Sequence, residues 1–122
     1  RKKAHILSEA EEKILALTGE MGQSPENIYS MFSDADLRFP DAVDKDGKAH
    51  QVTHGSYIPL VQSEDRVLRK SAFESMYGTF DKFKNTCAAT LSAQIKAVNF
   101  YAKARRYDSS LEAALDGTEV PV

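Results

Sequence analysis

Residues 64–106 constrain the fold more than any other part of this 122-residue chain. No proline interrupts the stretch, and its large apolar side chains recur mostly at steps of three or four residues, the spacing of one helical face. Only Gly78 weakens the pattern, by about 1 kcal/mol relative to alanine. We therefore predict one very long helix that begins near Ser63, whose hydroxyl can cap it. Its apolar positions are Leu68, Phe73, Met76, Tyr77, Phe80, Phe83, Cys87, Leu91, Ile95, Val98 and Tyr101.

Such a helix is too long for a compact domain of this size. About forty residues that each rise 1.5 Å span roughly 60 Å, whereas a compact chain of this length has a radius of gyration of about 14 Å. We therefore expect the helix to protrude, to kink or to belong to a larger body. The chain also begins at Arg1 without Met and ends at Val122 directly after a proline, so we expect a piece of a longer protein.

Two short helices are predicted before the long one. Ser8 and Glu11 have the spacing of a capping box, which predicts a helix start, and Gly19 and Gly22 predict its end. A second helix should begin at Ser24-Pro25, because proline is well tolerated at the first helical position.

The middle and the end of the chain complete the predicted fold. Alternating residues around a turn at Asp44–Gly47 predict a small β-hairpin over about residues 36–53. A short helix should follow at 57–61, where Pro59 must lie in the first turn or kink the helix, and a last helix should be capped by Asp108 or Ser109. The fold class is therefore mainly α, a single helical domain over residues 1–122 with one very long helix and a small β-hairpin.

Composition excludes several function classes. Sixteen Lys and Arg against eighteen Asp and Glu give a net charge of −2, which argues against a dedicated nucleic-acid binder. No apolar run approaches the ~18 residues of a transmembrane helix, and no signal peptide opens the chain. The single cysteine, Cys87, excludes an internal disulfide framework and is compatible with a reducing compartment. We predict a cytoplasmic protein without nucleic-acid or membrane partners.

The string from His50 to His54 has the spacing of the H-E-x-x-H zinc-peptidase motif, with Gln51 where the general base should stand. However, it follows the turn at Gly47 and contains β-branched residues, which favour a strand. On a strand four residues span roughly 13 Å, whereas two imidazoles that share a zinc ion each need a bond of ~2 Å. We therefore predict two solvent-facing or hydrogen-bonding histidines and no zinc site.

Three other features favour structural roles. Core packing is favoured over a ligand groove for the aromatic series Phe73, Tyr77, Phe80 and Phe83. Cys87 lies on the apolar stripe and is expected to be a small buried side chain rather than a nucleophile. The run 99–107 mixes aromatic and basic residues that offer a phosphate or carboxylate site, but cations in a last helical turn more often complement the helix dipole. Its members are Phe100, Tyr101, Lys103, Arg105, Arg106 and Tyr107. We assign no catalytic, cofactor-binding or metal-binding residue.

Seven short sequence segments, which together extend along nearly the whole chain, are informative as an ordered set. They are NIYSMF at 27–32, ADLRFP at 35–40, THGSY at 53–57, DRVLRKSAFE at 65–74, FKNT at 83–86, NFYAKARRY at 99–107 and SLEAAL at 110–115. Together they resemble the oligoendopeptidase F family of bacterial zinc metallopeptidases, relatives of thimet oligopeptidase.

The resemblance implies a parent several times longer, mostly helical, that cleaves short peptides inside an enclosed channel. Its zinc would be held by an H-E-x-x-H helix and a later Glu, downstream of this segment. These ligands are absent here, so no role as a zinc ligand is carried over to His5, His50 or His54. The implied role is a non-catalytic part of the N-terminal region that forms the channel wall, with the remainder of the parent and short peptides as partners.

The alternative is a free-standing helical interaction module with no enzymatic activity. The reading frame beyond Val122 distinguishes the two hypotheses, because the peptidase requires several hundred further residues with H-E-x-x-H. In either case the rest of the chain is too short to cover the whole apolar stripe of the long helix, so we expect the isolated segment to form a homodimer through like patches.

Replacing both His50 and His54 with Ala is expected to leave zinc uptake and folding nearly unchanged, because neither histidine is predicted to hold a metal. Calorimetric zinc titration and far-UV circular dichroism of the wild-type chain and the double variant check this. Stoichiometric zinc binding at micromolar or tighter affinity that disappears in the double variant would contradict the prediction.

Overall fold

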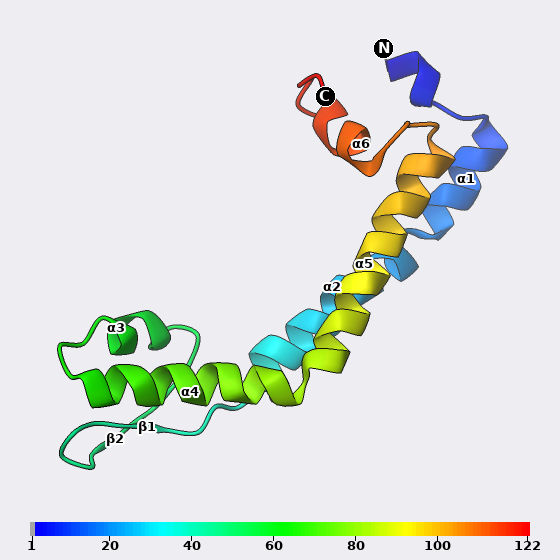
Figure 1. The fold of residues 1–122 in the computed structure, drawn as a ribbon. Helices are drawn as coiled ribbons and strands as arrows, with labels where there is room; N and C mark the ends of the chain where they lie inside the picture. Colours follow the sequence, from blue (N-terminus) through cyan, green and yellow to red (C-terminus); the bar gives the residue numbers. More distant parts are fainter. Residues whose placement is uncertain (1) are drawn as a thin grey trace. The chain divides into compact units, whose positions relative to one another are not determined.

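The computed structural model describes residues 2–122 and is mainly helical, as predicted (Figure 1). By its contacts the chain divides into two compact units, here called unit 1 (Arg1–Ser30 and Ala88–Val122) and unit 2 (Met31–Cys87). That residues 1–122 form a single domain stays a prediction. The elements in order are the 3₁₀ segment Lys2–His5, α1 (Glu9–Leu17), α2 (Gly19–Ser30), the π-helical segment Met31–Asp36, β1 (Ala42–Val43), β2 (Ala49–His50), α3 (Tyr57–Val61), α4 (Arg66–Lys82), α5 (Lys84–Ala104) and α6 (Ser110–Asp116).

The long helical stretch is confirmed, with one break. Helix α4 ends at Lys82 and α5 begins at Lys84, because Phe83 lies outside helical geometry at φ −113° and ψ 15°. The first turn also differs from the prediction, since Asp65 rather than Ser63 is the N-cap. The Asp65 carboxylate accepts the backbone N–H groups of Val67 and Leu68, while the Ser63 hydroxyl accepts the N–H of Asp65. Asp65 also has extended backbone angles, as an N-cap requires.

The predicted start of α1 and its end just before Gly19 are confirmed, but the predicted start of the second helix is wrong. The hydroxyl of Ser8 accepts the N–H of Glu11, whose carboxylate accepts the N–H of Ser8 in return. Only Thr18 separates α1 from α2, and α2 continues through Pro25 instead of beginning there. Gly22 is a packing residue rather than a terminator, because a Cβ at this position would collide with Tyr101 of α5. Gly22 therefore reflects a close approach of α2 to α5.

The β-hairpin is confirmed, although it is shorter than predicted. Strands β1 and β2 pair antiparallel, with Ala42 opposite His50, and Gly47 supplies the positive φ of the turn at +80°. Leu37 and Phe39 lie outside the strands, because the chain before them is π-helical and the N–H of Leu37 bonds to the carbonyl of Phe32. Helix α3 is confirmed with its proline in the first turn, and α6 is confirmed with Ser109 as its N-cap.

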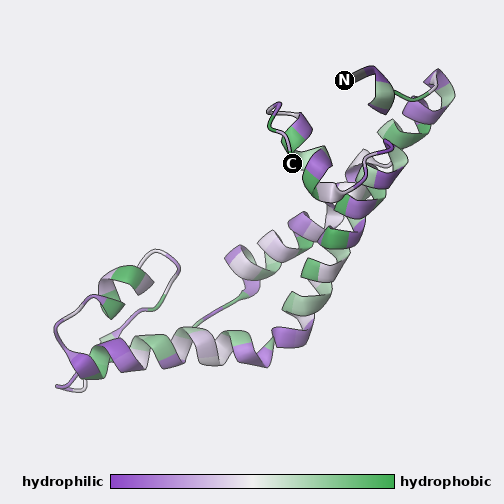
Figure 2. Ribbon diagram, turned by 45° about the horizontal axis from the view of Figure 1, so that its top comes forward, coloured by the Kyte–Doolittle hydropathy of each residue, from purple (hydrophilic) through white to green (hydrophobic). Residues whose placement is uncertain are grey.

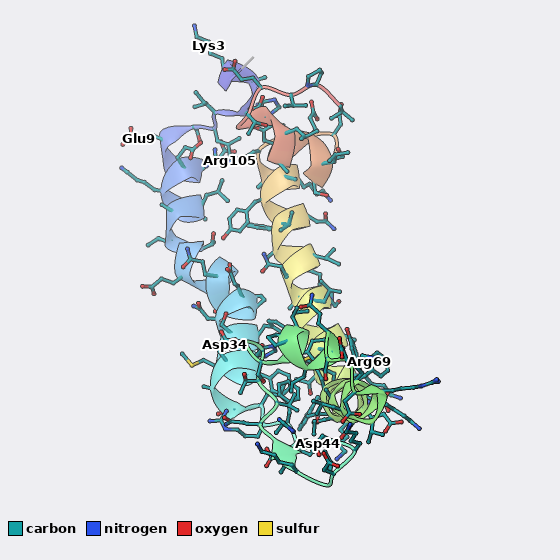
Figure 3. The ribbon with its side chains drawn as sticks, turned by 90° about the vertical axis from the view of Figure 1, so that its left-hand side faces the viewer. Lys3, Glu9, Asp34, Asp44, Arg69 and Arg105 are labelled. Atoms are coloured by element: carbon teal, nitrogen blue, oxygen red, sulfur yellow. The ribbon has the colours of Figure 1, made fainter. Side chains whose placement is uncertain are left out.

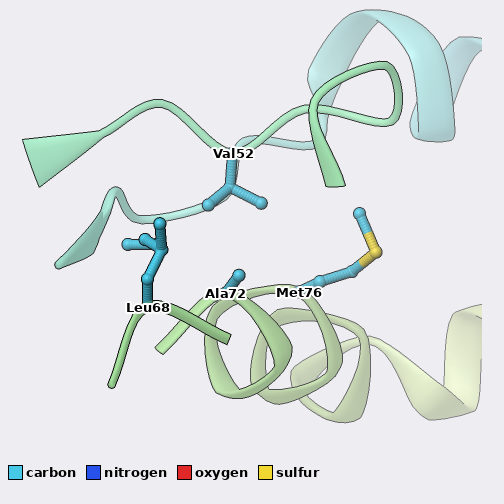
Figure 4. Packing of buried hydrophobic residues seen from close by; sticks show 5 residues of the cluster. Val52, Leu68, Ala72 and Met76 are labelled. Atoms are coloured by element: carbon cyan, nitrogen blue, oxygen red, sulfur yellow. The ribbon is translucent and has the colours of Figure 1, made fainter. Parts of the chain in front are cut away.

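Unit 2 is built on one face of α4. Leu68, Ala72 and Met76, spaced four residues apart, form its buried stripe, and Ala42 and Val52 pack against them (Figure 4). Ala42 and Ala72 are fully buried, so their small side chains permit close approach of the hairpin to the helix.

Polar contacts fix the hairpin on the same helix. The hydroxyl of Ser71 accepts the N–H of Val43, and the Asp65 carboxylate accepts the N–H of Lys45. The hydroxyl of Ser75 donates to the carbonyl of Pro40. One side of α4 therefore supplies both the apolar and the polar contacts of the hairpin.

In unit 1, α1 and α2 lie alongside α5 (Figures 1 and 3). Leu15 and Ala102 are the buried hydrophobic residues among its described positions. Hydrophobic residues instead recur along α5 (Figure 2), and much of their surface is in solvent, as for Leu91, which is 62% exposed. The exposed large apolar residues of α1, α2 and α5 are Ile14, Leu17, Met21, Ile28, Tyr29, Leu91, Ile95, Val98 and Phe100.

Within residues 2–122, no helix combines the length and the apolar character that crossing a membrane requires.

The exposed apolar face of α5 leads us to expect self-association of the 122-residue chain. Fully burying one large apolar side chain contributes roughly 1.5–3 kcal/mol, so a twofold dimer that covers Leu91 and Ile95 gains stability. Sedimentation from micromolar to hundreds of micromolar measures this, and Leu91→Glu or Ile95→Glu should shift the chain towards the monomer. A strict monomer across the range, unchanged in both variants, would contradict the prediction.

Candidate functional site

The two histidines of the zinc-like string have separate partners. His50 lies at the end of β2, with Nε2 2.8 Å from an oxygen of the Asp44 carboxylate. His54 lies in the turn before α3, with Nε2 3.3 Å from the Ser33 hydroxyl and its ring edge-on to Phe39. Both histidines therefore make hydrogen bonds, as predicted. Since each histidine has a structural partner, we expect the double alanine variant to be less stable than the wild-type chain. The sequence alone predicted that its folding would be nearly unchanged.

The described residues contain no cluster of side chains suited to binding a metal ion. Across residues 2–122, no group of three or more His, Cys, Asp or Glu side chains is arranged to hold a metal ion. The residues described here do not fit a zinc ion, and we derive no catalytic step through one. The absence of zinc binding itself stays a prediction.

Asp44 organises the hairpin turn, a role that the sequence analysis missed. One carboxylate oxygen accepts the N–H groups of Asp46 and Lys48, and the other contacts His50. The hydrogen bond with His50, followed by the backbone bond from Lys48, holds the pKa of Asp44 below its usual value. An Asp at the start of a turn that contains Gly is the signal for this role, because its side chain bonds to backbone groups a few residues later.

The basic residues near the end of α5 serve the fold of unit 1. Arg105 makes a bidentate ion pair with Glu12 of α1, at 2.9 and 3.0 Å, and also donates to the carbonyl of His5. The Glu12 pairing places Arg105 in a tertiary contact, which neither the anion-site reading nor the dipole reading predicted. Lys103 alone lies in the last turn of α5, where a cation complements the dipole.

Arg106 ends α5 through its backbone. It has a φ of +62°, its N–H bonds to the carbonyl of Lys103, and the next N–H, of Tyr107, bonds to the carbonyl of Ala102. This pair of bonds is the Schellman motif, which usually places glycine at the left-handed position. The Arg106 position therefore has a structural explanation that needs no ligand.

The tyrosines of this run join elements within unit 1. The Tyr101 hydroxyl lies 2.8 Å from that of Thr18 and donates to the Thr18 carbonyl. The Tyr107 hydroxyl donates to Asp116, and its ring stacks on His5 with 3.7 Å between centroids. The hydrogen bond to Asp116 and partial burial raise the pKa of Tyr107.

The aromatic series of α4 divides into two groups. Phe80 packs against the core of unit 2, as predicted, whereas Phe83 meets Phe32 edge-on but is 40% exposed and lies outside that core, so the prediction of core packing is wrong for Phe83. Phe73 and Tyr77 are 54% and 51% exposed, so the prediction of core packing is wrong for them. The buried stripe of α4 passes through Leu68, Ala72 and Met76 instead, and this stripe leaves Phe73 and Tyr77 towards solvent.

Cys87, expected to be buried, is partly buried. It does not line either of two hollows of unit 2. One is a cavity of about 370 Å³ with a mixed polar and apolar lining that includes Ser33, Asp34, Asp41 and His54. The other is an apolar groove of about 480 Å³ between α3 and α4.

Comparison with known proteins gives this geometry a context. The family model described as Oligopeptidase F matches residues 1–39. The oligopeptidase PepF of Bacillus subtilis is 43% identical over 121 residues, which are 99% of this chain and 18% of that protein. In the crystal structure of oligoendopeptidase-F from Enterococcus faecium, 97% of this chain is matched with a TM-score of 0.92 at 39% identity. The chain is homologous to the N-terminal region of the oligopeptidase F peptidases.

The match covers nearly all of this chain but only a small part of each relative. The plasmid-encoded oligoendopeptidase F of Lactococcus lactis subsp. cremoris is 40% identical over 120 residues, which are 98% of this chain and 20% of that protein. The chain thus spans about a fifth of the oligopeptidase F relatives that it matches. The seven stretches of resemblance noted in the sequence are therefore confirmed as a family relationship.

The ion pair between Glu12 and Arg105 should make the stability of unit 1 depend on pH. Hydrogen bonds from Arg105 and then from the N–H of Leu7 lower the pKa of Glu12 below its ordinary value of 4.5. A carboxyl group with a lowered pKa in the folded state stabilises the fold above its unfolded-state pKa, and this contribution is lost as pH falls through the folded-state pKa.

We therefore expect Glu12→Gln to lower the midpoint of thermal unfolding at pH 7 and to lose this difference from wild type as pH falls below 4.5. Circular dichroism melts between pH 7 and pH 2.5 measure it. Glu9→Gln in the same helix is the matched control, because Glu9 makes only an exposed pair with Lys13 and should change the midpoint little. Equal effects of both variants at every pH would argue against the role of the Glu12 pair.

Proposed function

We propose that this chain is a non-catalytic segment of an oligopeptidase F-type zinc metalloendopeptidase that hydrolyses short peptides, and that it forms part of the wall of the substrate channel. The observation that carries the proposal is the match of 97% of the chain to oligoendopeptidase-F of Enterococcus faecium at 39% identity. The chain covers 23% of that protein, so catalysis belongs in the larger remainder of the parent.

The interactions of the candidate residues support a scaffold role. His50 contacts Asp44, His54 contacts Ser33, and Arg105 pairs with Glu12. These groups hold elements of the fold together. Because their side chains are engaged in internal contacts, a structural role is favoured over a catalytic one. In the proposed parent, zinc supplies the hydrolytic chemistry at ligands outside these residues.

The apolar surface of unit 1 supports a larger body. Unit 1 buries Leu15 and Ala102 while Leu91, Ile95 and Leu17 stay exposed. Each large apolar side chain left in water forgoes roughly 1.5–3 kcal/mol of the stabilising free energy that its burial would contribute. We propose that other helices of the same parent cover this surface, that short peptides pass beside the segment, and that the enzyme works in the cytoplasm.

A photoreactive substrate tests the wall role in the parent enzyme. A short peptide with a benzophenone side chain, bound to the full-length enzyme and irradiated, is expected to label residues within this segment as well as the catalytic region. The label should disappear when an unmodified substrate peptide is present in excess. Mass spectrometry of the digested enzyme locates the label.

Two outcomes would contradict the proposal. Labelling confined to residues outside the segment would remove it from the channel wall. A reading frame that stops after Val122, without a downstream H-E-x-x-H motif, would favour the free-standing interaction module instead. The chain by itself, incubated with zinc and a quenched fluorescent peptide, should show no hydrolysis.

A further inference from the structure

The groove between α3 and α4 has no part in the scaffold role just described. It lies within unit 2, has a volume of about 480 Å³, and is lined by Tyr57, Val61, Arg66, Arg69, Lys70 and Phe73. We call it the α3–α4 groove.

One part of the groove is aromatic and exposed. Phe73 lies 4.7 Å from Tyr77 between ring centroids, and Tyr77 meets Tyr57 edge-on at 6.1 Å. Phe73 and Tyr77 are more than half exposed, because the core of unit 2 is closed on the neighbouring stripe of α4 that carries Leu68, Ala72 and Met76. The groove thus presents aromatic surface that the core of unit 2 does not use.

The other part of the groove is positively charged. Arg66, Arg69 and Lys70 project from the first turns of α4, and no carboxylate is among the lining residues. Arg69, labelled in Figure 3, donates from one guanidinium nitrogen to the carbonyls of Ser63 and Glu64, which holds its planar group in place. Lys70 approaches Glu74 at 3.7 Å, but both side chains are well exposed, so this pair is weak.

The placement of the cations makes the groove a complement to negative charge. The Asp65 carboxylate already complements the positive end of the α4 dipole, but neither it nor any other carboxylate is among the residues that line the groove. Guanidinium groups also match carboxylates in geometry and bind them through two parallel hydrogen bonds. A ligand for this groove therefore combines carboxylates with an apolar side chain.

We propose that the α3–α4 groove binds a short acidic peptide, with its carboxylates on Arg66, Arg69 and Lys70 and an apolar side chain against Tyr57 and Phe73. This site is separate from the zinc chemistry proposed for the parent and needs no catalysis. It gives unit 2 a recognition surface for acidic peptides in solution.

The test uses the 122-residue chain and three blocked tetrapeptides. The acidic probe is acetyl-Glu-Leu-Glu-Glu-amide, the neutral control replaces each Glu with Gln, and the third peptide replaces Leu with Gly. Calorimetry gives the affinities, and ¹⁵N-labelled spectra locate the site. The acidic probe is expected to bind saturably with shifts confined to α3 and the first half of α4, while both controls bind at least ten-fold more weakly.

Variants separate the groove from general charge. Arg66→Glu with Lys70→Glu should weaken the acidic probe at least ten-fold, and Phe73→Ala should weaken it several-fold. Lys82→Glu with Lys84→Glu makes the same charge change outside the groove and should alter the affinity less than two-fold. Arg69 is kept, because its bonds to the backbone support the start of α4.

Several results would overturn the proposal. The first is the absence of saturable binding by the acidic probe, and the second is equal affinity for the neutral peptide. The third is that the double variant at 66 and 70 and the double variant at 82 and 84 weaken binding equally. The fourth is full displacement of the probe by inorganic phosphate at a concentration equal to that of the probe. Phosphate displacement would show a simple anion site, and equal weakening would show attraction by overall charge. Because no readout is hydrolysis, failure here leaves the peptidase proposal standing, and success does not depend on it.

Discussion

The close contact of α4 with the hairpin organises everything else in unit 2. Ala72 and Ala42 are fully buried, and their small side chains let the two backbones approach while Leu68, Met76 and Val52 fill the space around them. Because this stripe fixes which side of α4 is inside, it also fixes which side is outside. Phe73 and Tyr77 then lie in solvent beside the cations of the first turns, and the α3–α4 groove is a consequence of that choice.

The polar residues of the chain follow a common pattern, in which charged groups join elements. Asp65 caps α4 and also holds the turn through the N–H of Lys45, and these hydrogen bonds lower its pKa. Glu12 performs a similar task for unit 1 with Arg105. Side chains that bond to backbone groups of two elements at once fix their positions in a way that apolar contacts alone do not. This is the behaviour of a scaffold.

The imbalance between buried and exposed apolar surface distinguishes the two units. Unit 2 has a core of five buried residues with further side chains packed on it, whereas the described part of unit 1 buries Leu15 and Ala102. The relatives are about five times longer than the chain, which agrees with a segment whose apolar faces meet other parts of a larger protein. The oligopeptidase F homology and the physical character of the surface thus lead to the same interpretation.

The sequence by itself determined what depends on neighbouring residues. The capping box of Ser8 and Glu11, the N-cap Ser109, the turn at Gly47 and the long helical stretch all follow from local hydrogen bonds and helical spacing. The histidine string was also read correctly as two hydrogen-bonding side chains. Only the tertiary structure decided the break at Phe83, the burial of Ala72 in preference to Phe73, the pairing of Arg105 with Glu12, and the role of Gly22 as a contact for Tyr101. The last three depend on partners at least ten positions away or on which of two neighbouring apolar stripes meets the rest of the fold, and helical spacing alone does not distinguish between such stripes.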